Sequence, residues 1–504
     1  MGGMRTWSVP LHRFWLSDLG WAALGGILGL VFLVSVWSWL SPLPLAVLFR
    51  GITRGTPADA FKLTWLFGAG FFTAHLLWLP SSLSSFLGPG ALVLSALLIA
   101  LLATMWGLTA ALTRRLLGPA TLWGLPLAWT VLDTLRAAGP LGFPWGSLGY
   151  AWTPTPLIQM ADLGGVALVG LLVALSAAAL ASGHRGAQLA VASALLLAAA
   201  YGLTRPDASD GTFQALLVQG NIDPRRKAAG RQPDELAHYL ALTRSRLRTA
   251  PADLVVWPET AAPEAPTEPW VRQALAPLPA PLLLGAPTWD RGLRNSVYAV
   301  QGGQIRGRQD KRQLVPFGET FPARAALDSL YRAVFSALGL PALTGTVPGE
   351  VAEPLAIGRL RAGVLICYES TFPAAARTLV AGGANVLVTV SNDAWFGPSV
   401  GAEQHFQMGR VRAIETRRWW IRAGNDGISA AVDPQGKVVA RFPRGVAGAF
   451  AAPYGLATSQ TLFVRWGNWV PVLAGLGLLV LWRRRRGQIR CSPQTTGRSA
   501  HPVA

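Results

Sequence analysis

The feature that most constrains this chain is a set of long apolar runs placed at its two ends. A helix needs about 20 mainly apolar residues to cross a bilayer. Runs of that kind lie at residues 60–79, 91–113, 118–136, 157–182, 187–203 and 466–482. The stretch from Phe14 to Phe49 is too long for one span and predicts two. The sequence therefore predicts a polytopic α-helical membrane protein with about eight spans.

Basic residues flank these runs in a consistent pattern. With a count of about eight spans, the basic groups fall on one side of the membrane and the long middle segment on the other. Positively charged loops prefer the cytoplasm, so the middle segment is predicted to lie outside it. The basic groups are Arg5, Arg13, Arg50, Arg54, Arg114, Arg115, His184, Arg185 and Arg483 to Arg486.

The middle of the chain reads as a globular domain. We predict four parts: a bundle at 1–209, an extracytoplasmic domain at 210–457, a last span at 458–486, and a disordered cytoplasmic tail at 487–504. Strands alternating with helices favour an α/β domain or a layered αββα sandwich. Helices are expected at 234–249, 372–381 and 403–419, and strands at 212–220, 253–257, 281–286, 296–301, 361–367, 385–391 and 428–433.

The chain is strongly basic, with 44 Lys and Arg against 25 Asp and Glu. Membrane topology accounts for much of this excess, and attraction to anionic lipid headgroups is the alternative. Nucleic acid is not an expected partner, because the middle domain faces away from the cytoplasm. The two cysteines, Cys367 and Cys491, fall on opposite sides of the membrane, so we expect no disulfide between them.

Three segments of the middle domain end in residues that could share one site. DLVVWPE ends in Glu259, DKRQLVPFGE contains Lys311 and Glu319, and GVLICYE contains Cys367. A carboxylate can take the proton of a thiol, and a lysine can stabilise the oxyanion that forms after the sulfur attacks. Taken singly, each residue is more often an ordinary strand end, a surface lysine or a core cysteine than part of a site. Their spacing alone does not predict that they meet.

The motifs WPE, KxxLVPFGE and ICYE occur in the order of the Glu–Lys–Cys triad of the nitrilase superfamily, which they resemble. The chain is similar, over nearly its whole length, to the bacterial apolipoprotein N-acyltransferases. The segments that carry this resemblance are LRAAGPLGFPWGSLGY (135–150), LVQGNI (217–222), the long stretch at 390–436 that begins VSNDAWFG, and VRWGNW (464–469). The resemblance implies a nitrilase-like αββα sandwich on a membrane bundle.

The resemblance also implies roles for individual residues. Glu259 is expected to be the general base, Lys311 the cation that stabilises the oxyanion, and Cys367 the nucleophile. Glu319 is expected to orient Lys311. Tyr368 and Glu369 match residues important for the site, and the Tyr368 amide is a plausible second oxyanion donor.

Further residues are candidates for binding substrate. Arg136 and Trp145, the latter within GFPW (142–145), are expected to shape a headgroup entrance, or else to form a tight turn between spans. Phe317, Trp395 and Phe396 could cover an acyl chain, or could be core aromatics. We expect no metal, because Glu403 and His405 lack a third ligand, and no cofactor. Asn392 and Asp393 are interpreted as turn formers rather than catalysts.

Members of the family move an acyl chain from a phospholipid to the enzyme's cysteine, and phosphatidylethanolamine is the expected donor for this chain. They then pass it to the α-amine of a diacylglyceryl-cysteine on a lipoprotein. The resemblance implies this activity here, in the bacterial cytoplasmic membrane with the catalytic domain on the periplasmic side. One departure is Ala228, which follows Lys227 where the family usually has tryptophan. The alternatives are a membrane-anchored amidase or hydrolase with the same triad, and an inactive lipid-binding protein.

Overall fold

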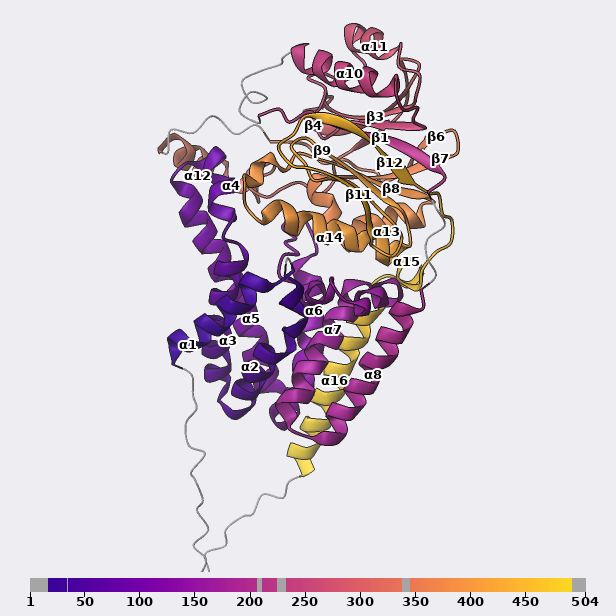
Figure 1. Cartoon of the computed structure of the whole chain (residues 1–504). Coiled ribbons are helices and arrows are strands. Elements are labelled where there is room, and N and C mark those ends of the chain that lie inside the picture. Colours follow the sequence, from indigo (N-terminus) through magenta and orange to yellow (C-terminus); the bar gives the residue numbers. More distant parts are fainter. Residues whose placement is uncertain (1–16, 34, 206–210, 224–232, 338–344, 492–504) are drawn as a thin grey trace, which may run out of the picture.

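The computed structural model describes residues 17–33, 35–205, 211–223, 233–337 and 345–491. A bundle of helices forms one half of the molecule, and a two-sheet sandwich sits on one end of it (Figure 1). Ala228 and most of the predicted tail lie outside the described residues. The predicted domain limits at 209, 457 and 486 stay predictions.

In the described part of the chain, the bundle contains eight helices from the N-terminal part and α16 from the C-terminal part (Figure 1). A capping box begins α3: the Thr56 hydroxyl accepts from the Asp59 N–H, and the Asp59 carboxylate accepts from the Thr56 N–H. The helices are α1 (Asp18–Val31), α2 (Pro42–Arg54), α3 (Pro57–His75), α4 (Leu79–Leu87), α5 (Gly90–Leu117), α6 (Thr121–Arg136), α7 (Ala161–Ser182), α8 (Arg185–Leu203) and α16 (Trp469–Cys491).

Helices occupy every region in which the sequence predicts spans, but the count of eight is not confirmed. Among the described residues, three helical segments are long and apolar enough to cross a membrane: Gly90–Arg136, Pro156–Ser182 and Arg185–Leu203. The first of these joins α5 and α6 through a short 3-10 turn. The apolar helix α1 is shorter than a full span.

Basic residues gather at the end of the bundle that lies away from the sandwich. The Arg114 Nε donates to the Gly55 carbonyl at 2.9 Å, and the Arg485 Nη1 donates to the Arg115 carbonyl. These contacts join the turn before α3, the end of α5 and the end of α16 (Figure 1). One pole of the bundle is therefore basic, which agrees with the charge pattern in the sequence.

The sandwich consists of two six-stranded sheets. The first sheet has the order β12-β1-β2-β3-β4-β5 and the second has the order β11-β10-β9-β8-β7-β6. In each sheet the three central strands run parallel and the outer pairs run antiparallel. The strands are β1 (Phe213–Gln219), β2 (Leu254–Val256), β3 (Leu282–Trp289), β4 (Leu293–Gln301), β5 (Gln304–Asp310), β6 (Leu355–Ile357), β7 (Leu360–Ile366), β8 (Val386–Ser391), β9 (Trp420–Gly424), β10 (Ser429–Val432), β11 (Val438–Phe442) and β12 (Gly448–Tyr454).

Successive side chains of each strand point to opposite faces of its sheet, so each sheet packs against one layer on either side. Leu217 of β1 faces the second sheet, whereas its neighbour Leu216 packs under α10 (Pro233–Leu247) and α11 (Pro269–Leu275). On the other side, α13 (Pro373–Ala381) and α14 (Gly401–Thr416) cover the second sheet and separate it from the bundle (Figure 1). The parallel strands at the middle of each sheet are buried on both faces, as is usual for such strands. The predicted αββα sandwich is confirmed.

A buried ion pair on α14 joins the sandwich to the bundle. Arg412 Nε lies 3.2 Å from Glu415 Oε2, and both side chains are fully buried. Glu415 Oε1 accepts from the Val166 N–H at 2.8 Å, directly after Gly164 and Gly165 break the helical geometry of α7. A broken helix frees backbone N–H groups, and the carboxylate supplies an acceptor for one of them.

We expect Glu415→Leu to destabilise the protein by about 3–5 kcal/mol, because it leaves the Arg412 charge buried without its partner. The double variant Arg412→Met/Glu415→Leu should recover part of this loss and stay about 1–3 kcal/mol below the wild type, because the Val166 N–H is left unpaired. Thermal unfolding in detergent measures both. A double variant no more stable than Glu415→Leu would contradict this role of the Arg412–Glu415 ion pair.

Candidate active site

Glu259, Lys311 and Cys367 each follow the end of a strand. Glu259 comes three residues after β2 and Lys311 directly after β5, both in the first sheet. Cys367 follows β7 of the second sheet and begins the 3-10 helix Cys367–Thr371. The site therefore forms where the two sheets of the sandwich meet, and each residue depends on a different strand for its position.

Lys311 is the centre of the cluster. Its Nζ donates to Glu259 Oε1 at 3.0 Å and to Glu319 Oε1 at 2.7 Å, and its side chain is 1% exposed. Asn295 Nδ2 and the Asn392 backbone N–H also donate to the Glu259 carboxylate, at 2.7 and 3.0 Å. The structure thus brings the predicted Glu259, Lys311 and Glu319 into direct contact.

The charges in this cluster depend on one another. Burial alone would lower the pKa of Lys311, but the Glu259 and Glu319 carboxylates outweigh it and raise that pKa well above its ordinary value. The ammonium is therefore kept charged where it can face a developing negative charge. Glu319 is held in turn, because its Oε2 accepts from the Val315 N–H at 2.8 Å.

Cys367 sits on a sharp turn beside this cluster. Its backbone has φ +52°, a left-handed conformation that residues other than glycine rarely adopt. Burial and the Glu259 carboxylate raise the pKa of the Cys367 thiol, although Lys311 lowers it in part. The resting sulfur is therefore a thiol, which needs a base to take its proton before it can attack.

Glu369 holds the turn that carries the cysteine. Its carboxylate accepts from the N–H groups of Arg312 and Gln313 at 2.8 and 3.2 Å, and from that of Ile366 at 2.8 Å. Burial nevertheless raises the pKa of Glu369. These bonds tie the strand of Cys367 to the loop of Lys311, so Glu369 positions both segments.

Tyr368 and Trp145 form an aromatic layer between the turn of Cys367 and the bundle. Their rings stack with centroids 5.8 Å apart, and Trp145 also stacks on Phe143 at 5.2 Å. The Tyr368 hydroxyl donates to the Gly142 carbonyl at 2.7 Å. The predicted GFPW segment therefore lies directly against the residue that follows Cys367.

Arg136 is buried beneath that segment. Its Nη1 donates to the carbonyls of Phe143 and Trp145 at 3.1 and 2.9 Å, and its Nη2 donates to Asp133 Oδ1 at 3.1 Å. Only 1% of the side chain is exposed. This geometry favours the tight-turn interpretation of Arg136, and contact with a headgroup stays a prediction.

The remaining aromatic candidates are Phe396, Phe317 and Trp395. Phe396 packs edge-on against Trp78 of the bundle, with ring centroids 4.9 Å apart. Phe317 and Trp395 are half-buried, and Phe317 adopts φ +61° in the loop before Glu319. A role for either in covering an acyl chain stays a prediction.

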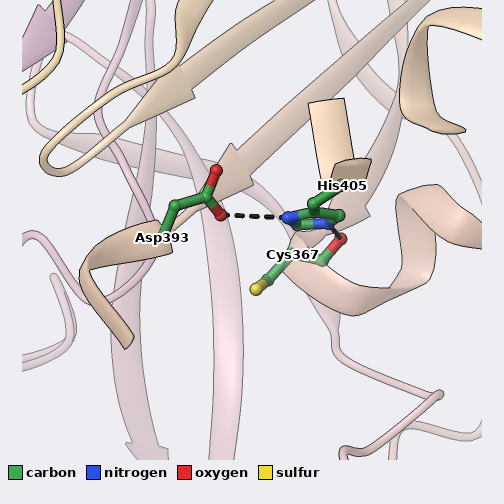
Figure 2. Close-up of side chains that lie close together, drawn as sticks. All are labelled: Cys367, Asp393 and His405. Atoms are coloured by element: carbon green, nitrogen blue, oxygen red, sulfur yellow. Dashed lines mark hydrogen bonds and ion pairs between the residues drawn. The ribbon is translucent and has the colours of Figure 1, made fainter. Parts of the chain in front are cut away.

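Sequence reasoning missed a second buried cluster behind Cys367. Asp393, interpreted from the sequence as a turn former, contacts His405 and Arg422, and all three side chains are 0–1% exposed. An oxygen of Asp393, a ring nitrogen of His405 and the Cys367 sulfur all lie within 4.8 Å of one another (Figure 2). In the sequence, the available signal is that Asp393, His405 and Arg422 are polar residues within segments that are otherwise typical of a buried core.

Comparison with known proteins identifies the chain. The family model for the apolipoprotein N-acyltransferase N-terminal domain matches residues 24–179, and that for carbon-nitrogen hydrolases matches residues 215–452. An apolipoprotein N-acyltransferase of Azotobacter vinelandii is 33% identical, over 95% of this chain and 98% of its own length. The chain belongs to the apolipoprotein N-acyltransferase family.

Further family members show the same relationship. The Pseudomonas putida enzyme is 31% identical over 94% of this chain and 99% of its own, and the Geobacter metallireducens enzyme is 32% identical over 90% and 92%. Among solved structures, Nit3 of Saccharomyces cerevisiae, from the nitrilase superfamily, aligns with 56% of this chain and 96% of its own at 18% identity and a TM-score of 0.36.

The raised pKa of Cys367 predicts slow alkylation at neutral pH. In a Cys491→Ser background, we expect iodoacetamide to react with Cys367 more slowly than with free cysteine, and the rate to keep rising beyond the ordinary thiol pKa of about 8.5. Lys311→Met should slow the reaction further, because it removes the charge that favours the thiolate. A rate that levels off near neutral pH would show a preformed thiolate and contradict this electrostatic account.

Proposed function

We propose that this protein carries a fatty acyl chain from a phospholipid, through a thioester on Cys367, to the N-terminal α-amine of a diacylglyceryl-cysteine on a lipoprotein. The observation that carries the proposal is the bonding of Lys311 to both Glu259 and Glu319 beside Cys367. Similarity to this family over nearly the whole chain supports an acyltransferase function. Phosphatidylethanolamine is the proposed donor.

In the first half-reaction, Glu259 takes the thiol proton as the Cys367 sulfur attacks the ester carbonyl of the phospholipid. The tetrahedral oxyanion is stabilised by the Lys311 ammonium and the Tyr368 backbone N–H. Collapse breaks the bond to the glycerol oxygen, which takes the proton back from Glu259. The products are a lysophospholipid and the acylated cysteine.

In the second half-reaction, the lipoprotein amine attacks the thioester and passes a proton to Glu259. The same two donors stabilise the second oxyanion. The Cys367 sulfur leaves as the amide forms, and it regains its proton from Glu259. Both halves use one base and one oxyanion site, so neither needs a rearrangement of the cluster.

The setting of the reaction is also part of the proposal. The bundle lies in the bacterial cytoplasmic membrane with about eight spans, and the sandwich faces the periplasm. The basic pole made by Arg114, Arg115 and Arg485 supports this orientation. The aromatic layer of Tyr368 and Trp145 then sits at the level where lipids could approach Cys367 from the side.

Mass spectrometry of the intact protein tests the proposal. Incubation with phosphatidylethanolamine should add one fatty-acyl mass to Cys367, and hydroxylamine should remove it. Cys367→Ala should show no adduct, whereas Cys491→Ser should match the wild type. A diacylated lipopeptide should discharge the adduct and become triacylated. If the lipopeptide has no effect and water clears the thioester, the protein is a membrane-anchored hydrolase instead.

A further inference from the structure

His405 of α14 lies behind the nucleophile and has no role in the scheme above. Its ring is 1% exposed and points at the turn of Cys367 (Figure 2). The Nε2 atom lies 3.0 Å from the Cys367 carbonyl oxygen and 3.0 Å from Ser370 Oγ. The Nδ1 atom lies 3.0 Å from Asp393 Oδ1.

Asp393 is fixed more firmly than a turn former would be. Ser391 Oγ donates to its Oδ1 at 2.7 Å, and the fully buried Arg422 donates from Nη2 to its Oδ2. Burial would raise the pKa of Asp393, but Arg422 and His405 outweigh burial and lower it. An ionised carboxylate only accepts hydrogen bonds, so it holds Nδ1 of His405 and thereby sets the plane of the ring.

The atom at the other end of the ring is the carbonyl of the nucleophile itself. Ser370 Oγ donates to the same oxygen at 2.8 Å. Nε2 of His405 can donate to it only when that nitrogen carries a proton, and with Nδ1–H bonded to Asp393 this requires the doubly protonated ring. In that form two side chains hold the carbonyl. The peptide group between Cys367 and Tyr368 is planar, and in its trans form the C=O and the following N–H point in opposite directions. Holding the Cys367 carbonyl therefore aims the Tyr368 N–H away from His405.

We propose that His405, oriented by Asp393, is a positioning residue that fixes the Cys367–Tyr368 peptide plane so that the Tyr368 N–H faces the oxyanion. The left-handed backbone of Cys367, with φ +52°, is the reason such an anchor is needed, because the turn would otherwise relax. The inference rests on the proposed function, since an oxyanion forms only in acyl transfer.

Proximity of sulfur, carboxylate and imidazole also fits a metal site, but the bonding favours the anchor. Both ring nitrogens of His405 already face oxygen acceptors, and Asp393 is paired with Arg422. A metal ion would have to break the contacts that hold the turn. The carboxylate and the imidazole are therefore assigned to one hydrogen-bonded network around the carbonyl of Cys367.

Two reactions of the Cys367 sulfur distinguish a positioning role of His405 from a general packing role. Alkylation by iodoacetamide passes through no oxyanion, whereas acylation by phosphatidylethanolamine does. In a Cys491→Ser background, His405→Leu should slow acyl-enzyme formation about 10- to 100-fold, less than the about 10²–10³-fold effect of deleting a donor outright. Its alkylation rate should stay close to that of the parent protein.

Matched variants sharpen the test. His405→Gln keeps an N–H that can reach the Cys367 carbonyl and should restore part of the acylation rate. Ser370→Ala removes the other donor to that oxygen and should give the same selective loss, to a smaller extent, even if His405→Leu fails to fold. His184→Leu makes the same chemical change at an exposed position and should behave as the parent.

Two outcomes overturn the inference. One is an equal fall in alkylation and acylation in folded His405 or Ser370 variants, which would place the effect on the sulfur. The other is an acylation rate that neither variant changes. A parent protein that forms no acyl-enzyme at all would instead overturn the proposed function, and this inference with it.

Discussion

The buried ammonium of Lys311 is the constraint on which the rest of the site depends. Removing an ion from water costs several kcal/mol unless partners compensate for the lost hydration. Glu259 and Glu319 provide this compensation, but only if the ends of β2 and β5 and the PFGE loop converge. The fold of the sandwich and the charge state of the catalytic groups are therefore parts of one arrangement.

Two carboxylates around one lysine leave an excess of negative charge beside the sulfur. Burial and the Glu259 carboxylate raise the pKa of the Cys367 thiol despite the nearby ammonium, so Cys367 is protonated at rest. A resting thiol is less exposed to oxidation and stray alkylation than a thiolate. In the proposed mechanism, proton transfer to Glu259 is therefore part of the attack by the sulfur.

Helix α14 connects this chemistry to the bundle. One face carries His405 toward Cys367, while Gln404 accepts from Trp78 Nε1 at 2.9 Å and Glu415 accepts from the broken turn of α7. The aromatic layer around Trp145 adds a second connection through Tyr368. The turn of Cys367 is thus held from both sides, by the second sheet and by helices that are expected to lie in lipid.

Sequence patterns predicted the sandwich and the strands that carry Glu259 and Cys367, because buried parallel strands read as short apolar runs. They missed β9, where Arg422 interrupts the run and is buried only because Asp393 lies opposite. The network of His405 was missed for the same reason. A polar residue is seen to be buried only when its partner in the folded structure is known, and the sequence does not show which residues are partners. The span count stays open because charged residues such as Asp59 and Lys62 interrupt α3.

The most direct test of this account is the single-turnover rate of acyl-enzyme formation in Lys311→Met and Lys311→Arg at saturating phospholipid. If the buried ammonium stabilises the oxyanion, Lys311→Met should lose about 10²–10³-fold or more. Lys311→Arg should not restore the rate, because a planar guanidinium cannot take the place of a compact ammonium between Glu259 and Glu319. A Lys311→Met protein that is acylated at nearly the wild-type rate would contradict the central claim.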